Sequence, residues 1–229
     1  MRILAIDTCC GAVSACVLDS GADGAIARRT EPMARGHAEA LAPLLEELLA
    51  GVAGGFASLD RIAATAGPGS FTGIRIGLAT ARAMGLALEI PVLGVSTLVA
   101  FAAPLLLEAR SEIIASVIDA HHGRVYLQLF EATGRPLLPP RVDGLREAAR
   151  AIGAGPVRIA GSGARLLAIE AARLGVAVER ADGAEFPDIV AIARIGLATE
   201  PRACPPRPVY LKPPDARPAS GEGVARVNS

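Results

Sequence analysis

Apolar residues along the first half of the chain alternate with polar ones or gather in short runs, and glycine-containing turns separate the runs. Short runs of this kind predict strands. Between His37 and Ala50 the apolar positions instead follow helical spacing, at Leu41, Leu44, Leu45, Leu48 and Leu49. The predicted order is strands Arg2–Asp7, Ala12–Leu18 and Ala25–Thr30, helix His37–Ala50, strand Arg61–Ala66, helix Phe71–Leu88, a strand at Val92 and a helix from Ser96.

The second half repeats this order. Predicted strands are Ile113–Asp119, Arg124–Glu131, Leu137–Val142, Val157–Ala160 and Val176–Glu179, and predicted helices are Asp143–Ile152, Gly163–Leu174 and Asp188–Thr199. The pattern Ile-Asp-x-x-x-Gly-x-Val opens the first half at Ile6 and returns at Ile118, 112 residues later. A shared order of elements and a shared opening motif indicate two related α/β lobes.

Two βββαβα lobes, each with an aspartate at the end of its first strand, describe the actin-like ATPase architecture, a ribonuclease H-like fold. Ligands of open α/β sheets bind at the carboxyl ends of the strands, here between the lobes. We expect a first lobe over 1–99 and a second over 100–215, with a helix near 188–200 packing back on the first. Residues 216–229 are polar and predicted to be disordered.

The helix Phe71–Leu88 carries small residues every fourth position, at Gly73, Gly77, Ala81 and Gly85. These positions share one helical face. Each glycine costs about 0.5–1 kcal/mol relative to alanine within a helix. The stripe therefore predicts a backbone packed very close to it, either from this chain or from a partner. We expect an exposed helix–helix interface with a partner.

Composition narrows the function classes. The formal net charge is zero, 52% of residues are hydrophobic, and Lys212 is the single lysine. A dominant basic surface for nucleic acid is disfavoured. Cysteines 9, 10, 16 and 204 form no C-x-x-C pair, so reduced, mostly buried thiols are expected.

Residues 90–107 carry no charge, which is about the minimum length of a membrane span. Pro91, Gly94 and Pro104 interrupt this run, so a buried strand, a turn and a buried helix fit better. The start of the chain lacks the apolar stretch of a signal peptide. We therefore expect a cytoplasmic protein without a membrane segment.

Candidate chemistry lies at the two opening motifs. Asp7 and Asp119 are each able to position a magnesium-bound phosphate or to accept hydrogen bonds from their own turns, and the sequence leaves both alternatives open. Gly11 supplies no second carboxylate. His121 and His122 are adjacent and point in opposite directions on an extended chain, which disfavours a shared metal.

The turn before the glycine-rich helix, with Gly67, Gly69 and Ser70, could bind an anion through backbone amides. The alternative is that Ser70 or Thr72 caps the helix. No nucleophile, base and orienting residue can be identified as a triad.

At this point the residues resemble the TsaB (YeaZ) family, the non-catalytic members of the bacterial machinery that makes threonylcarbamoyladenosine in tRNA. The AGPGSFTGIRIGLATARAMGLAL block at 66–88 is its most specific motif. Supporting motifs are ILAIDT at 3–8, GHAEAL at 36–41, IPVLGVSTL at 90–98, IDA…VY at 118–126 and PVYLKPPDARP at 208–218.

The resemblance implies a non-catalytic scaffold that activates a TsaD-like transferase, with a TsaE-like ATPase as a further partner and a homodimer when alone. Contact with tRNA, and a nucleotide at the heterodimer junction, are left open. The implied interface lies on the first two helices of the chain. Its expected residues are His37, Leu41, Leu44, Leu45, Leu48, Gly73, Gly77, Thr80, Ala81, Met84 and Gly85.

Departures from the catalytic relatives support this expectation. Thr97 and Phe101 stand where TsaD carries an H-x-x-x-H metal site, and Asp119-Ala120-His121-His122 replaces its second phosphate loop. We therefore expect no catalytic residue, metal or firm cofactor site. The family's usual arginine near His121 and glutamate near Arg124 are missing, so no role is assigned to His121, His122 or Arg124. The alternative is an actin-like ATP-binding enzyme, or a metallopeptidase-like one, acting alone.

Overall fold

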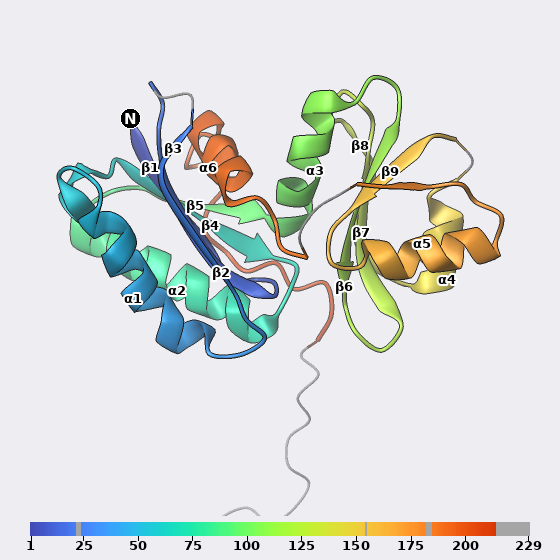
Figure 1. The fold of residues 1–229 in the computed structure, drawn as a ribbon, viewed down its shortest axis with the longest axis horizontal. Helices are drawn as coiled ribbons and strands as arrows, with labels where there is room; N and C mark the ends of the chain where they lie inside the picture. Colours follow the sequence, from blue (N-terminus) through green and yellow to red (C-terminus); the bar gives the residue numbers. More distant parts are fainter. Residues whose placement is uncertain (22–23, 154, 182–184, 214–229) are drawn as a thin grey trace, which may run out of the picture.

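The computed structural model describes residues 1–21, 24–153, 155–181 and 185–213. Its first sheet has the strand order β3-β2-β1-β4-β5, in which β1 pairs antiparallel with β2 and parallel with β4 (Figure 1). The strands are β1 Arg2–Asp7, β2 Ala12–Asp19, β3 Ala25–Pro32, β4 Arg61–Gly67 and β5 Val92–Ser96.

The second sheet repeats this topology in the order β8-β7-β6-β9-β10. Its strands are β6 Ile113–Asp119, β7 Arg124–Phe130, β8 Pro136–Gly144, β9 Val157–Ala160 and β10 Glu179–Arg180. Strand β6 pairs antiparallel with β7 and parallel with β9, as β1 does with β2 and β4. The equivalence of β1 and β6 confirms two related lobes of the actin-like fold.

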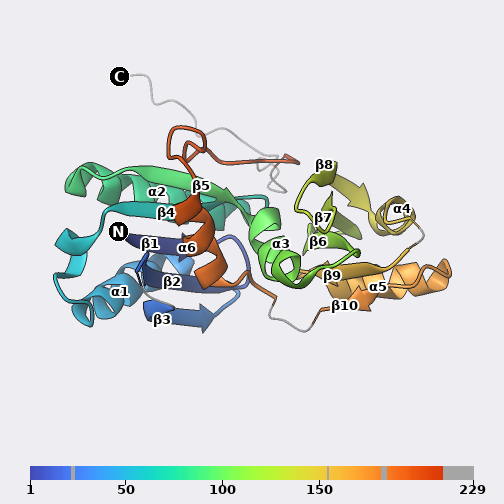
Figure 2. The same cartoon turned by 90° about the horizontal axis from the view of Figure 1, so that it is seen from above.

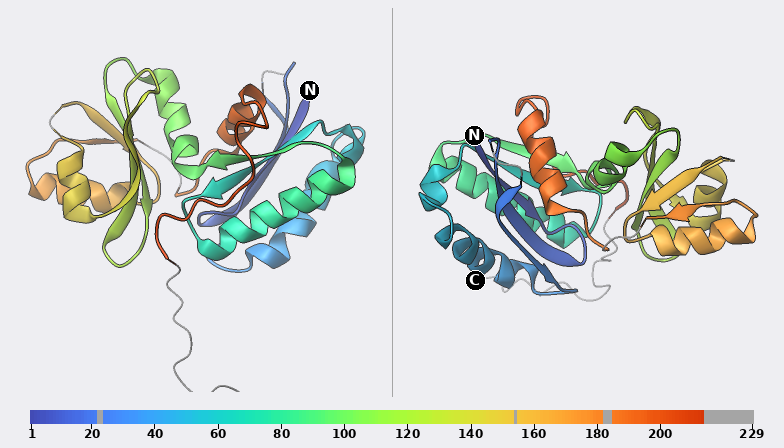
Figure 3. Two further views of the ribbon diagram at one scale, coloured as in Figure 1. Left: turned by 180° about the vertical axis from the view of Figure 1, so that it is seen from behind. Right: turned by 45° about the horizontal axis from the view of Figure 1, so that its top comes forward.

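In the described part of the chain, six α-helices cover the two sheets: α1 His37–Ala50, α2 Phe71–Leu88, α3 Thr97–Glu108, α4 Leu145–Ala151, α5 Ala164–Arg173 and α6 Ile189–Ala198. Helices α1 and α2 pack on one face of the first sheet and α6 on the other (Figures 1 and 3). Helices α4 and α5 cover the outer face of the second sheet. Helix α3 lies between the two sheets (Figure 2).

The structure confirms most predicted helices and strands, although some begin or end a few residues from the predicted positions. Of the segment predicted as strand Val176–Glu179, only Glu179 lies in a strand, the two-residue β10 that ends at Arg180. A short 3₁₀ helix, Gly55–Ser58, was not predicted. The predicted tail 216–229 lies outside the described residues. Within the described part of the chain, no helix is long and apolar enough to cross a membrane.

The small-residue stripe of α2 packs against the chain's own first sheet, so its predicted place in a partner interface is wrong. A Cβ atom at Gly73 would overlap the carbonyl oxygen of Thr8, and one at Gly77 would lie 2.6 Å from Thr8 Oγ1. A Cβ at Gly85 would overlap the side chain of Val92. Ala81 is fully buried. The close backbone neighbour is therefore the end of β1, with β5 beside it.

The leucine stripe of α1 requires the same correction. The predicted interface leucines of α1 are buried in the core between α1, α2 and the sheet, and they are not exposed to a partner. They are Leu41, Leu44, Leu45 and Leu48. Of the expected interface residues, His37, Thr80 and Met84 are half-buried. His37 Nε2 lies 3.1 Å from the carbonyl oxygen of Cys10, which ties the start of α1 to the β1–β2 turn.

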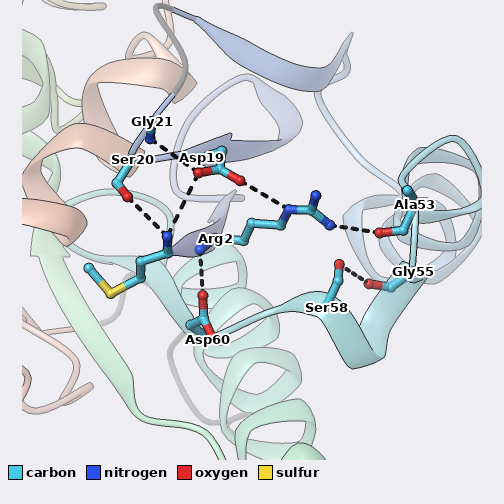
Figure 4. A network of polar contacts seen from close by, with 9 residues as sticks. Arg2, Asp19, Ser20, Gly21, Ala53, Gly55, Ser58 and Asp60 are labelled. Carbon is cyan, nitrogen blue, oxygen red and sulfur yellow. Dashed lines mark hydrogen bonds and ion pairs between the residues drawn. The ribbon is translucent and has the colours of Figure 1, made fainter.

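A polar network fixes the far end of β1, away from the Asp7 end (Figure 4). Arg2 Nε donates to Asp19 Oδ2 at 3.1 Å, and Arg2 Nη1 donates to the carbonyl oxygen of Ala53 at 2.7 Å. The backbone N–H of Arg2 donates to Asp60 Oδ2 at 2.6 Å. Hydrogen bonds from the Gly21 N–H and from Arg2 lower the pKa of Asp19. The network anchors β1, β2 and the segment before β4 to one another.

Replacing Gly73 with alanine tests the packing of α2. Alanine gains about 1 kcal/mol in helix propensity, but its Cβ meets backbone atoms of Thr8 that cannot move without shifting β1. We expect Gly73→Ala to lower the free energy of unfolding by roughly 1–3 kcal/mol, measured by urea denaturation. Gly11→Ala is the matched control, since nothing lies within 4 Å of its Cβ position. A Gly73→Ala protein as stable as the control would contradict this packing.

Candidate functional site

A cavity of about 640 Å³ lies between the lobes where the turns after β1 and β6 face each other. Its walls come from the β1–β2 turn, the start of α2, the β6–β7 turn and the chain's C-terminal segment. Lining residues include Cys10, Gly11, His37, Ser70, Phe71, Asp119, His121, Tyr126, Tyr210 and Lys212. This is the position in which open α/β sheets bind ligands.

Asp7 does not line this cavity. Its side chain is fully buried, and its Oδ1 accepts hydrogen bonds from Thr65 Oγ1 at 2.5 Å and from the N–H of Cys9 at 3.0 Å. Burial raises the pKa of Asp7 despite these bonds. Its Oδ2 atom has no hydrogen-bond partner among the described residues. Of the two alternatives for Asp7, the geometry matches a carboxyl group that organises its own turn.

Asp119, the counterpart of Asp7 in the second lobe, does line the cavity, and 32% of its side chain is exposed. Its Oδ1 accepts from the N–H of His121 at 2.8 Å, and His121 Nδ1 lies 3.6 Å from Oδ2. His121 and His122 both adopt positive φ, 60° and 52°, in the tight turn that precedes Gly123. The two equivalent aspartates therefore have different environments, one dry and one open.

The turn Gly67–Ser70 packs against the turn that follows β1. The N–H of Ser70 donates to the carbonyl oxygen of Cys9 at 2.8 Å, and Ser70 Oγ accepts from the N–H of Gly73 at 3.2 Å. A Cβ at Gly69 would overlap the same Cys9 carbonyl. Ser70 is thus the helix cap that one alternative predicted, and its amide is not free for an anion.

Thr97 and Phe101, the positions where the family resemblance implied metal ligands in the catalytic relatives, hold buried side chains. Thr97 is fully buried, and Phe101 packs with Leu98, Ile118 and Tyr126 between the lobes. In the ranges that the structure describes, no group of three or more histidine, cysteine, aspartate or glutamate side chains could hold a metal ion.

The cysteines are free thiols, as predicted. Cys9 and Cys16 are buried. Burial raises the pKa of Cys9 and Cys10, and it raises that of Cys16 to about 12. Thiols of this kind are poor nucleophiles at neutral pH.

The outward face of α2 is a second candidate site, and sequence analysis missed it. Thr72, Arg75, Ala79, Arg82 and Leu86 are exposed at helical spacing, with Ala83 and Ala87 beside them. Leu86 is 83% exposed. We call these seven residues the outer α2 face. The glycines that face the sheet determine which residues of α2 face outward. The sequence therefore identifies the outer α2 face once the direction of the glycines is known.

The outward face of α1 adjoins this surface and carries acidic residues. Glu39 and Glu46 are exposed, with Ala38, Ala42 and Pro43 between or beside them. Small residues and a large exposed leucine on α2, next to an acidic neighbour, give a surface suited to helix packing with polar contacts at its rim.

Comparison with known proteins supplies independent information. A family model described as TsaD, tRNA N6-adenosine threonylcarbamoyltransferase, matches residues 30–179. An uncharacterized protein of Mycobacterium tuberculosis is 34% identical over 216 residues, 94% of each chain. The tRNA threonylcarbamoyladenosine biosynthesis protein TsaB of Escherichia coli is 36% identical over 126 residues, 55% of this chain. That match spans about half, 53%, of the E. coli protein.

Two solved structures from Pseudomonas aeruginosa share the whole architecture. The one described as YeaZ has a TM-score of 0.73 and 29% identity, covering 92% of this chain and 99% of that one. The other, described as an uncharacterized protein with similarity to peptidase YeaZ, has a TM-score of 0.75 and 27% identity over the same shares.

Fold and site define a two-lobed, actin-like α/β protein whose first-lobe turn is closed by its own packing. Sequence and structural matches then identify the group. The chain belongs to the TsaB (YeaZ) family, within the broader group that the TsaD model describes.

The protonation of Asp7 gives a test by pH. Because its pKa in the folded protein is raised above 3.8, the unfolded chain loses this proton first as pH rises. The stability linked to Asp7 is therefore full below about pH 4 and falls as pH rises toward the folded pKa. Asp7→Asn can keep the Oδ1 acceptor without a charge.

We expect the variant to gain stability over the wild-type protein as pH rises from about 4 to about 7, measured by urea denaturation at each pH. A wild-type protein that gains over Asp7→Asn in this range would instead indicate a depressed pKa and a cationic partner for the carboxylate.

Proposed function

We propose that this protein is a non-catalytic subunit that binds a TsaD-like threonylcarbamoyltransferase through α1 and α2 and activates it for threonylcarbamoyladenosine modification of tRNA. Cytoplasmic location follows from that role. The observation that carries the proposal is the outer α2 face, where Leu86 is 83% exposed on a helix whose opposite side is fixed in the core.

The cleft supports a non-catalytic role. Asp7 is buried away from the cavity, the amide of Ser70 is already hydrogen-bonded, and Thr97 and Phe101 are buried at the positions where the family resemblance implied metal ligands in the catalytic relatives. Each of these groups contributes to the internal packing of the protein. A site built in this way offers Asp119 as the single carboxylate of the two opening motifs that reaches the cavity.

The outer α2 face supports a helical partner. Ala79 and Ala83 allow a second helix to approach closely, and Leu86 supplies apolar area that water now covers. Arg75 and Arg82 lie at the border of this apolar strip. A partner helix with small or apolar residues facing Ala79 and acidic residues facing the arginines would match the surface.

The same surface accounts for self-association when the partner is missing. Arginines project from α2, and Glu39 and Glu46 project from the neighbouring α1. A two-fold axis would bring α2 of one copy against α1 of the other, so opposite charges would meet twice. Docking on the transferase then competes with this homodimer. Activation would arise because the complex favours an active conformation of the partner.

Leu86→Asp tests the docking surface. The substitution places a charge in the proposed contact without removing a core side chain, because Leu86 is already exposed. We expect at least a tenfold weaker affinity for the TsaD-like subunit of the same organism by calorimetry, or about 1.4 kcal/mol. Threonylcarbamoyladenosine formation in a reconstituted assay should fall with it, at an unchanged melting temperature.

Ile169→Asp is the matched control, since Ile169 is 47% exposed on α5 of the other lobe. Equal affinities of wild-type protein, Leu86→Asp and the control would remove α2 from the interface. Transferase activity that does not depend on this chain would overturn the activating role.

A further inference from the structure

The chain beyond α6 crosses from the first lobe into the cleft. In the left view of Figure 3, this red segment runs close to α2 and ends between the two sheets. We call residues 204–213 the C-terminal segment. It forms neither helix nor strand, yet its main chain and side chains contact both lobes.

Two backbone hydrogen bonds attach the C-terminal segment to the first sheet. The N–H of Gly94 donates to the carbonyl oxygen of Cys204 at 3.0 Å, and the N–H of Val209 donates to that of Ala66 at 2.7 Å. A Cβ at Gly94 would lie 3.1 Å from the Pro205 oxygen. Glycine at this position lets the segment lie directly on the strand.

Within three residues after Val209, the C-terminal segment also contacts the second lobe. Leu211 packs into the apolar cluster formed by Leu98, Phe101, Ile118, Ala120 and Tyr126. Lys212 Nζ donates to the carbonyl oxygen of Ala120 at 2.7 Å. The segment thus joins β4 and β5 of one sheet to the end of β6 in the other.

The same segment holds the arginines of the outer α2 face. Arg75 Nε donates to Tyr210 Oη at 3.2 Å, and its guanidinium lies 3.9 Å from the centre of the Phe71 ring. The rings of Phe71 and Tyr210 are 4.8 Å apart. Arg82 donates to the carbonyl oxygen of Pro206.

We infer that the C-terminal segment is an intramolecular latch that fixes the two lobes relative to each other and, through Arg75 and Arg82, the geometry of the outer α2 face. Lobes of one chain move as rigid bodies unless their contacts restrain them. Leu211 and Lys212 supply such a restraint at the cleft, where a small displacement at the segment becomes a rotation of the second lobe.

Spin-label distances between the lobes test the latch on the full chain. Cysteines at Ala50 on α1 and Ala172 on α5 are exposed labelling positions, and Cys10→Ser and Cys204→Ser remove the two half-buried thiols from every variant. Burial protects Cys9 and Cys16 from the label. We expect Leu211→Ala to broaden the inter-lobe distance distribution, and a chain ending at Pro208 to broaden it further.

Val209→Ala is the control, because its side chain is 38% exposed and its backbone bond is kept. Its distribution should equal that of the wild-type protein. Circular dichroism melting confirms that each variant is folded. A folded chain ending at Pro208 with the wild-type distribution overturns the latch.

The effect on the outer α2 face rests on the proposed function and has a separate readout. The chain ending at Pro208 should bind the TsaD-like subunit more weakly than Val209→Ala does. Unchanged affinity with altered distances would overturn the coupling to α2. Failure of the wild-type chain to bind would overturn the proposed function, and the spin-label distances would still decide the latch.

Discussion

The structure depends on the contact between the small-residue face of α2 and the backbone at the end of β1. Gly73 and Gly77 allow the helix to touch Thr8, and Thr8 Oγ1 donates to the carbonyl oxygen of Gly73 at 2.7 Å. At this contact the N–H of Ser70 donates to the carbonyl oxygen of Cys9, and Asp7 is buried beneath the turn. The contact also fixes the rotation of α2 about its axis. The packing of α2 on β1 therefore determines which residues of α2 face outward, and it keeps Asp7 and the amide of Ser70 out of the cavity.

The opening motif has different surroundings in the two lobes. Asp7 and Asp119 occupy equivalent strand ends, yet burial raises the pKa of Asp7 while Asp119 faces the cavity. The first turn is filled by α2, and the C-terminal segment reaches toward the second. Internal packing has thus filled the first-lobe turn, while the second-lobe turn still lines the cavity. The surface that we propose for the partner lies on the outside of α1 and α2.

Periodicity and the repeated opening motif were sufficient to predict the two lobes and nearly every element, because strong apolar patterns determine which face is buried. The direction of the glycine stripe could not be predicted. A small-residue face suits close approach of any backbone, and the sequence does not say whether that backbone is Thr8 or a partner helix. Likewise, the leucines of α1 could equally mark a core or an interface. The contacts of residues 204–213 were not predictable, since a segment without regular structure has no period to follow.

The orientation of α2 in a complex distinguishes most directly between its outer face and its glycine face as the contact with a partner. A structure of this protein bound to the TsaD-like transferase that we propose as its partner, at a resolution that shows side chains, measures which face the partner covers. We expect Ala79, Ala83 and Leu86 to become buried, while Gly73, Gly77 and Ala81 keep their contacts with the chain's own sheet. A complex in which the partner leaves the outer α2 face in solvent, or in which α2 rotates its glycines toward the partner, would contradict this expectation.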